Sequence, residues 1–176
     1  MMIRSLCIAS TVGLALLLGS CLWKEPVFTE DFSKVDEGLE GVWFSKDGDD
    51  DPRDGSFAIC MRIDEDRYLL HHPAREDDGI YYEARPLKRQ GRTLLQLRIL
   101  GTFEDGGVKP ETARFVLLWV QPQADGSMVV RLPDGEDDLE KMTPAEFRKR
   151  LEDPAHDWEK FFGEGTAYRR ISPRPE

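Results

Sequence analysis

Short runs of alternating apolar and polar residues fill the middle of the chain. The clearest run places Phe57, Ile59, Met61 and Ile63 on one face and Arg62 on the other. Alternation with a period of two is typical of a strand with one buried face. Most runs are joined by short polar turns, which favours an antiparallel meander of about eight strands, closed as a barrel or folded as a sandwich. The predicted strands are 39–44, 56–64, 67–71, 79–87, 92–103, 112–121, 127–132 and 166–171.

The run over 112–121 differs from the others because both of its faces are apolar. Phe115, Leu117 and Trp119 lie on one face, and valine and leucine occupy the positions between and after them. A strand that is apolar on both faces needs cover on both sides. The sequence therefore predicts a second layer packed against this strand.

Before the last predicted strand the pattern changes to that of helices. Thr143, Pro144 and Glu146 give a capping box with proline at the first helical position, which predicts a helix near 144–152. A second helix is predicted near 154–162. The pair forms a two-helix insertion, and its aromatic stripe is the expected partner of the extra apolar face of 112–121. That stripe consists of Trp158, Phe161 and Phe162.

The first residues follow the three-part order of a secretory signal. Arg4 supplies a positive charge, residues 6–18 are apolar and nearly uncharged, and small residues follow. The apolar run is shorter than the roughly 20 residues that a helix needs to cross a hydrocarbon core. This segment could be an ordinary signal peptide. It could also be a membrane helix that extends beyond the apolar run.

The tetrad Leu18-Gly19-Ser20-Cys21 resembles the lipobox of bacterial lipoproteins. The resemblance implies cleavage before Cys21, a diacylglycerol thioether on its sulfur, and acylation of the new amine, with palmitate as an expected chain. Leu22 stands where an aspartate commonly marks inner-membrane retention, so the outer membrane of the cell envelope is favoured, with its periplasmic and surface faces both open. The predicted organisation is a signal peptide over 1–20, a lipidated cysteine with a tether over 21–36, a β domain over 37–172 and a tail over 173–176.

Near the start of the β domain, Gly41-Val42-Trp43 resembles the first-strand G-x-W of lipocalins and lipocalin-like bacterial proteins. The resemblance implies a barrel whose closed end is plugged by Trp43. It covers three residues, and the chain departs from lipocalins because the helix pair precedes the last strand and no long helix follows. An ordinary core tryptophan is the alternative for Trp43.

Charge and cysteine content limit the classes of function. The chain has 24 Lys and Arg against 34 Asp and Glu, a net charge of −10. An acidic protein is a poor ligand for nucleic acid, because affinity for a duplex depends on neutralising phosphates. With Cys7 in the signal and Cys21 lipidated, Cys60 is the remaining thiol, so no internal disulfide is predicted.

Two clusters of polar residues are candidates for metal sites. The loop over 47–55 is rich in aspartate, but it lacks the glycine and glutamate positions of an EF-hand, which favours a solvated loop. His71 and His72 are followed by Glu76, Asp77 and Asp78. Adjacent residues of a strand point to opposite faces, so the two imidazoles converge poorly on one ion. Metal binding by His71, His72, Asp77 and Asp78 is kept as a minor hypothesis.

These observations favour a lipid-anchored, non-enzymatic binding module of the cell envelope, with no cofactor. Its partner is either a small apolar ligand in the barrel or an envelope protein. A structural or assembly lipoprotein that presents its Trp119 side or its helix side is the first alternative, and a metal-dependent hydrolase is the second. The packing of the β interior separates the ligand hypothesis from the others, because a ligand cup predicts a cavity of a few hundred Å³.

Overall fold

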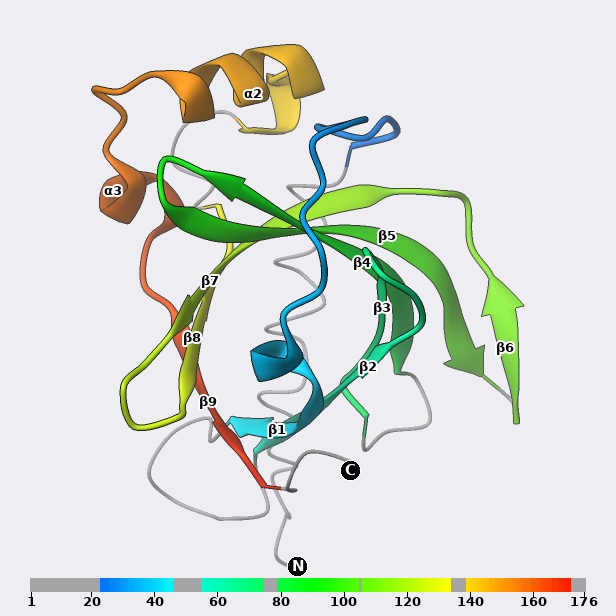
Figure 1. The fold of residues 1–176 in the computed structure, drawn as a ribbon. Coiled ribbons are helices and arrows are strands. Elements are labelled where there is room, and N and C mark those ends of the chain that lie inside the picture. The colour runs from blue at the N-terminus through cyan, green and yellow to red at the C-terminus, as the bar shows by residue number, and fades with distance from the viewer. Residues whose placement is uncertain (1–22, 46–54, 75–78, 105, 134–138, 172–176) are drawn as a thin grey trace, which may run out of the picture.

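The fold is a closed antiparallel barrel, which is one of the two architectures that the alternating pattern favours. The computed structural model describes residues 23–45, 55–74, 79–104, 106–133 and 139–171. These residues form nine strands, eight of which close into a lipocalin-like barrel because β1 pairs with both β2 and β9 (Figure 1). The eight are β1 (Gly41–Ser45), β2 (Ser56–Arg62), β3 (Tyr68–His72), β4 (Ile80–Arg89), β5 (Arg92–Glu104), β7 (Phe115–Pro122), β8 (Met128–Arg131) and β9 (Thr166–Arg170).

The ninth strand, β6 (Gly107–Pro110), was not predicted from the sequence. It pairs with the last residues of the long strand β5 and extends the sheet outside the closed ring. All four of its residues are exposed, and only Val108 is a large apolar residue. A strand of four exposed residues is too short to show a periodic pattern in the sequence. It forms because the last residues of β5 extend beyond the ring and are available for pairing.

The alternating face of β2 is the outer face of the barrel. Phe57 and Ile59 are half-buried, and the side chains of Met61 and Ile63 are 49% and 52% exposed. The inward positions of this strand hold the small side chains of Ala58 and Cys60. The register explains this choice, because Ala58 pairs with Trp43, whose indole already occupies the interior.

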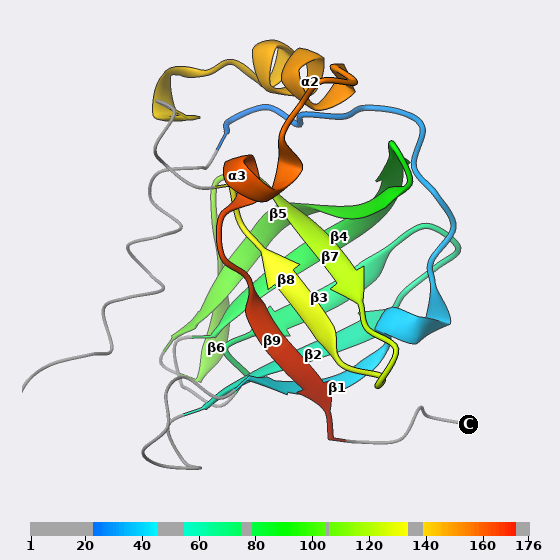
Figure 2. The same cartoon turned by 90° about the vertical axis from the view of Figure 1, so that its left-hand side faces the viewer.

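A second hydrophobic core lies outside the barrel wall, as the two apolar faces of β7 predict. Helices α2 (Pro144–Glu152) and α3 (Trp158–Phe162), preceded by the 3-10 helix η3 (Leu139–Lys141), cover this wall (Figure 2). The capping box of α2 is present, with the Thr143 amide donating to Glu146 at 2.8 Å. The second helix begins at Trp158 and not near 154, because Asp157 accepts from the Lys160 amide and caps it there. None of the described helices has the length and apolar character needed to span a bilayer.

The predicted tether is wrong for residues 23–36, which we call the strap. Trp23 forms an antiparallel bridge with Phe115, and Val27 and Phe28 are buried in the outer core. The strap then leads to the 3-10 helix η1 (Glu37–Leu39) and into β1. Because this segment has no periodic pattern, its packing could not be predicted from the sequence.

Candidate functional site in the barrel interior

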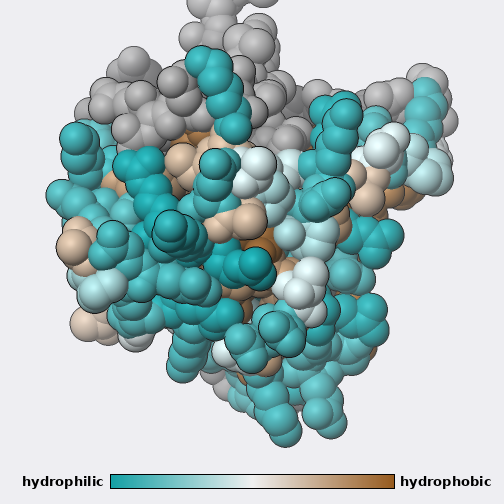
Figure 3. All heavy atoms as spheres, turned by 90° about the horizontal axis from the view of Figure 1, so that it is seen from above, coloured by the Kyte–Doolittle hydropathy of each residue, from teal (hydrophilic) through white to brown (hydrophobic). Residues whose placement is uncertain are grey.

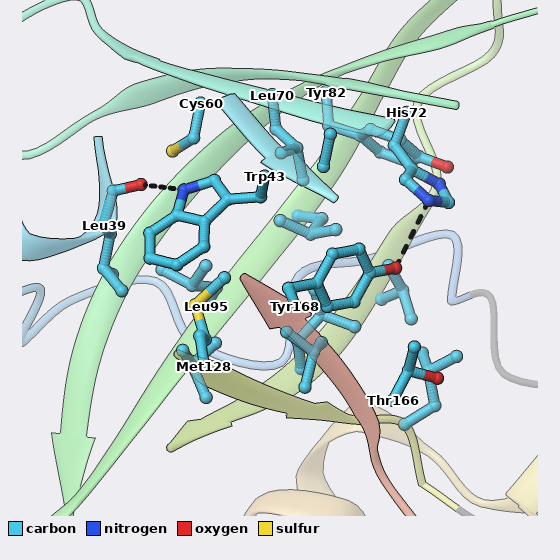
Figure 4. Close-up of a pocket in the computed structure, with 17 residues that line it drawn as sticks. Leu39, Trp43, Cys60, Leu70, His72, Tyr82, Leu95, Met128, Thr166 and Tyr168 are labelled. Carbon is cyan, nitrogen blue, oxygen red and sulfur yellow. Dashed lines mark hydrogen bonds between the residues drawn. The ribbon is translucent and has the colours of Figure 1, made fainter. Parts of the chain in front are cut away.

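The inside of the barrel contains an apolar cavity of about 120 Å³. Its walls come from every strand of the ring, and most of the lining side chains are aliphatic or aromatic (Figure 4). The cavity is smaller than the few hundred Å³ expected of a ligand cup, because large inward side chains such as Trp43 and Tyr82 fill much of the interior. The lining residues are Leu39, Trp43, Ala58, Cys60, Leu70, His72, Tyr82, Leu95, Leu97, Val116, Leu118, Val120, Met128, Val130, Leu132, Thr166 and Tyr168.

Trp43 lines the cavity at the end of the barrel that η1 covers (Figure 1). The indole N–H of Trp43 donates to the carbonyl oxygen of Leu39 at 2.9 Å. On the other side, the guanidinium carbon of Arg170 lies 4.7 Å from the ring centre, and Arg170 donates to the carbonyl of Gly38. These contacts join strand β1, strand β9 and η1 at one end of the ring, where sequence analysis placed a plug.

The opposite end of the cavity carries polar side chains, gathered around His72. The Nε2 atom of His72 lies 2.9 Å from the hydroxyl of Ser56. It also lies 3.3 Å from the hydroxyl of Tyr168, a contact that Figure 4 marks with a dashed line. His72 and Tyr168 are half-buried and Thr166 is exposed, so the cavity approaches the surface here. The sequence could not indicate Ser56 or Tyr168, because they are 16 and 96 residues from His72 and only the strand register unites them.

Ser45 adds a second polar feature at this end. It is the last residue of β1, and strand alternation puts its side chain on the same inward face as that of Trp43. Its residue surface is 1% exposed, and its hydroxyl has no hydrogen-bond partner among the described residues.

The two histidines of the predicted metal site diverge. The ring of His71 stacks on Tyr81 with centroids 4.1 Å apart, and partial burial lowers the pKa of His71, whereas His72 points into the cavity. No cluster of three or more His, Cys, Asp or Glu side chains suited to a metal occurs within the described part of the chain. Glu76, Asp77 and Asp78, the acidic loop apart from Gly55, and the lipobox with Cys21 lie outside the described residues.

The chemistry of this end suits reversible hydrogen bonding. A neutral imidazole offers one donor or one acceptor at Nε2, so the hydroxyls of Ser56 and Tyr168 compete for the same atom. A ligand oxygen or nitrogen can take the place of one hydroxyl. In contrast, burial raises the pKa of the Cys60 thiol to about 12, which keeps this cavity residue protonated and unreactive near neutral pH.

Trp119 is not available as a presenting surface. Its side chain is 3% exposed and packs edge-on against Trp158 and Phe162 of α3. A surface on this side of the barrel is therefore formed by the helices that cover Trp119, and the hypothesis of an assembly protein stays a prediction for its helix side.

Comparison with known proteins found no relative whose function could indicate the function of this chain. No protein-family model matches the chain, and searches of the curated proteins and of the solved structures each found no match. The function is therefore argued from the site itself.

Proposed function

We propose that this protein is a lipid-anchored, non-enzymatic binding domain of the cell envelope whose barrel holds a compact apolar ligand with one polar end. The apolar cavity inside the closed barrel is the observation that carries this proposal. An engineered cavity of about 150 Å³ lined by aliphatic and aromatic side chains stays dry and binds benzene. A cavity of about 120 Å³ therefore suits one aromatic ring or a short aliphatic chain, and excludes larger fused-ring molecules.

The polar end of the ligand would meet His72, with Ser56 and Tyr168 as the neighbouring hydroxyls. A net hydrogen bond contributes about 0.5–1.5 kcal/mol, or roughly a threefold to tenfold difference in affinity. The apolar wall would supply most of the affinity, and the His72 cluster would set the orientation and the preference for a polar group.

The proposed membrane anchor is a lipid on Cys21. Each methylene buried in a bilayer contributes about 0.8 kcal/mol, so two or three acyl chains hold an otherwise acidic domain at a membrane. Metabolic labelling with a palmitate analogue tests this part of the proposal. The wild-type protein should carry the label, the Cys21→Ser protein should not, and equal labelling of both would refute the anchor.

Ligand binding is tested with toluene and 4-methylphenol, which share one ring and differ in one hydroxyl. A protein that begins at residue 22, and so lacks both the apolar signal and Cys21, avoids detergent micelles, into which these probes would partition. Both probes should shift the amide resonances of cavity residues and stabilise the fold, by about 2.7 kcal/mol at a hundredfold excess over Kd.

Ala58→Leu, which adds carbons inside the cavity, provides the blocking variant, and Ile59→Leu on the outer face is its matched control. Ala58→Leu should abolish the shifts while Ile59→Leu keeps them. A wild-type protein that responds to neither probe, or an Ala58→Leu protein that responds like the wild type, would end the small-ligand proposal.

A protein partner is the second candidate, and the outer face of β2 favours it. Phe57, Ile59, Met61 and Ile63 form an apolar row there, and the last two are about half exposed. Photo-crosslinking in cells from position 61 should capture a stoichiometric partner if this face is an interface. A matched crosslinker at position 149 on α2 serves as the control.

A further inference from the structure

The first described residue of the chain is held tightly against the outer core. The amide of Trp23 donates to the carbonyl of Phe115 at 2.9 Å, and the amide of Phe115 donates back to Trp23 at 2.8 Å. The indole N–H of Trp23 donates to the carbonyl of Met142 at 2.9 Å, and its ring contacts Phe147 of α2 with centroids 4.6 Å apart. Trp23 therefore has a fixed place beside α2.

Cys21 is two residues before Trp23 in the sequence. Two residues of extended chain span at most about 7 Å, whereas a free tether over 22–36 would reach roughly 50 Å. A lipidated cysteine lies at the boundary between headgroups and acyl chains, so the body cannot move far from that boundary while Trp23 stays docked.

We infer that the side of the domain formed by the start of the strap, η3 and α2 rests on the phospholipid headgroups of the bilayer. This inference rests on the proposed lipidation of Cys21 and adds the orientation of the domain. The barrel axis points towards the viewer in Figure 1, and α2 lies to one side of the ring, across from β1. The axis therefore runs along the membrane plane, and the outer face of β1 and β2 turns away from the lipid.

The contact is a headgroup contact set by the anchor. Figure 3 views this side of the molecule, and most of its described surface is hydrophilic. Its exposed charged side chains are equally divided between the two signs, and the half-buried Arg148 and Arg150 of α2 add positive charge. Apolar insertion therefore does not orient the domain. The exposed charged residues of the strap's start, η3 and α2 are Lys24, Glu25, Lys141, Glu146, Lys149 and Glu152.

The test uses the full lipidated protein, purified from cells and reconstituted into phosphatidylcholine vesicles that contain headgroup-spin-labelled lipid. A fluorophore is attached through Lys149→Cys on the outer side of α2, or through Ile63→Cys on the far side as the matched control. The buried and protonated Cys60 does not compete for the label. We expect the spin label to quench position 149 several-fold more than position 63 in phosphatidylcholine alone, where no anionic lipid attracts the basic residues of α2.

The outcomes separate the orientation from the anchor. A Trp23→Ala protein keeps the lipid but loses the indole hydrogen bond to Met142 and the ring contact with Phe147, so its two positions should be quenched more equally. Wild-type protein that floats with vesicles but shows equal quenching, or stronger quenching at position 63, would overturn the orientation and leave the anchor intact. Protein that fails to float, or a Cys21→Ser protein that floats equally well, would overturn the anchor itself.

Discussion

The side-chain amide of Gln96 is expected to hold the strap on the barrel. Gln96 lies in β5 and is 5% exposed. Its Oε1 atom accepts from the amide of Phe28 at 2.7 Å, and its Nε2 atom donates to the carbonyl of Phe28 at 2.9 Å. The Gln96 side chain thus bonds both the N–H and the C=O of Phe28, as the backbone of a neighbouring strand would. The two residues are 68 positions apart in the sequence.

Gln96→Leu removes both hydrogen bonds while keeping an apolar side chain of similar size. If the strap stays in place, the amide and the carbonyl of Phe28 are left unsatisfied, at about 1–3 kcal/mol each. If the strap detaches instead, Val27 and Phe28 lose their burial, which is worth about 1.5–3 kcal/mol for each side chain. The two routes predict that the free energy of unfolding falls by about 2–6 and about 3–6 kcal/mol, a large part of the roughly 5–15 kcal/mol of a typical domain.

Urea unfolding followed by tryptophan fluorescence measures this loss, and hydrogen exchange at the Phe28 amide reports whether the strap has detached. Gln123→Leu is the matched control, because Gln123 is exposed in the turn before β8. The control should change stability by less than about 0.5 kcal/mol, as ordinary surface substitutions do. An equally small effect of Gln96→Leu would refute the reasoning that the amide holds the strap.

Three further predictions test the site and the outer core. His72→Leu should weaken binding of 4-methylphenol about threefold to tenfold and leave toluene binding nearly unchanged, measured by resonance titration; an equal loss for both probes would count against a polar end at His72. Thr143→Ala should lower the free energy of unfolding by about 1 kcal/mol, because the capping box of α2 is lost, with Thr166→Ala in β9 as a comparison. The pKa of Cys60 rises from 9.0 to about 12 on folding, so stability should fall as pH rises above 9. At pH 10 this group should account for on the order of 1 kcal/mol of the loss, and a Cys60→Ala protein whose stability shows the same pH dependence would contradict it.

Features that depend on residues close together in the chain could be predicted from the sequence. They are the strand pattern, the helix caps and the two apolar faces of 112–121. Period-two alternation predicted the eight strands of the ring, and the Thr143-Pro144-Glu146 signal located the start of α2. Trp43 was recognised from a three-residue motif at the start of the first strand. These local signals predicted the strands and the layer outside them, whereas the pairing of β1 with β9 decided that the sheet closes as a barrel and does not form a sandwich.

Other features depended on contacts between residues far apart in sequence. The strap is docked by Gln96 and Phe115, and the polar end of the cavity unites Ser56, His72 and Tyr168. Which face of β2 points inward was decided by the space that Trp43 leaves in a narrow ring, not by the size of the apolar residues in that strand. Sequence periodicity fixes which side chains share a face, but strand register and the available volume decide where that face points and what it meets.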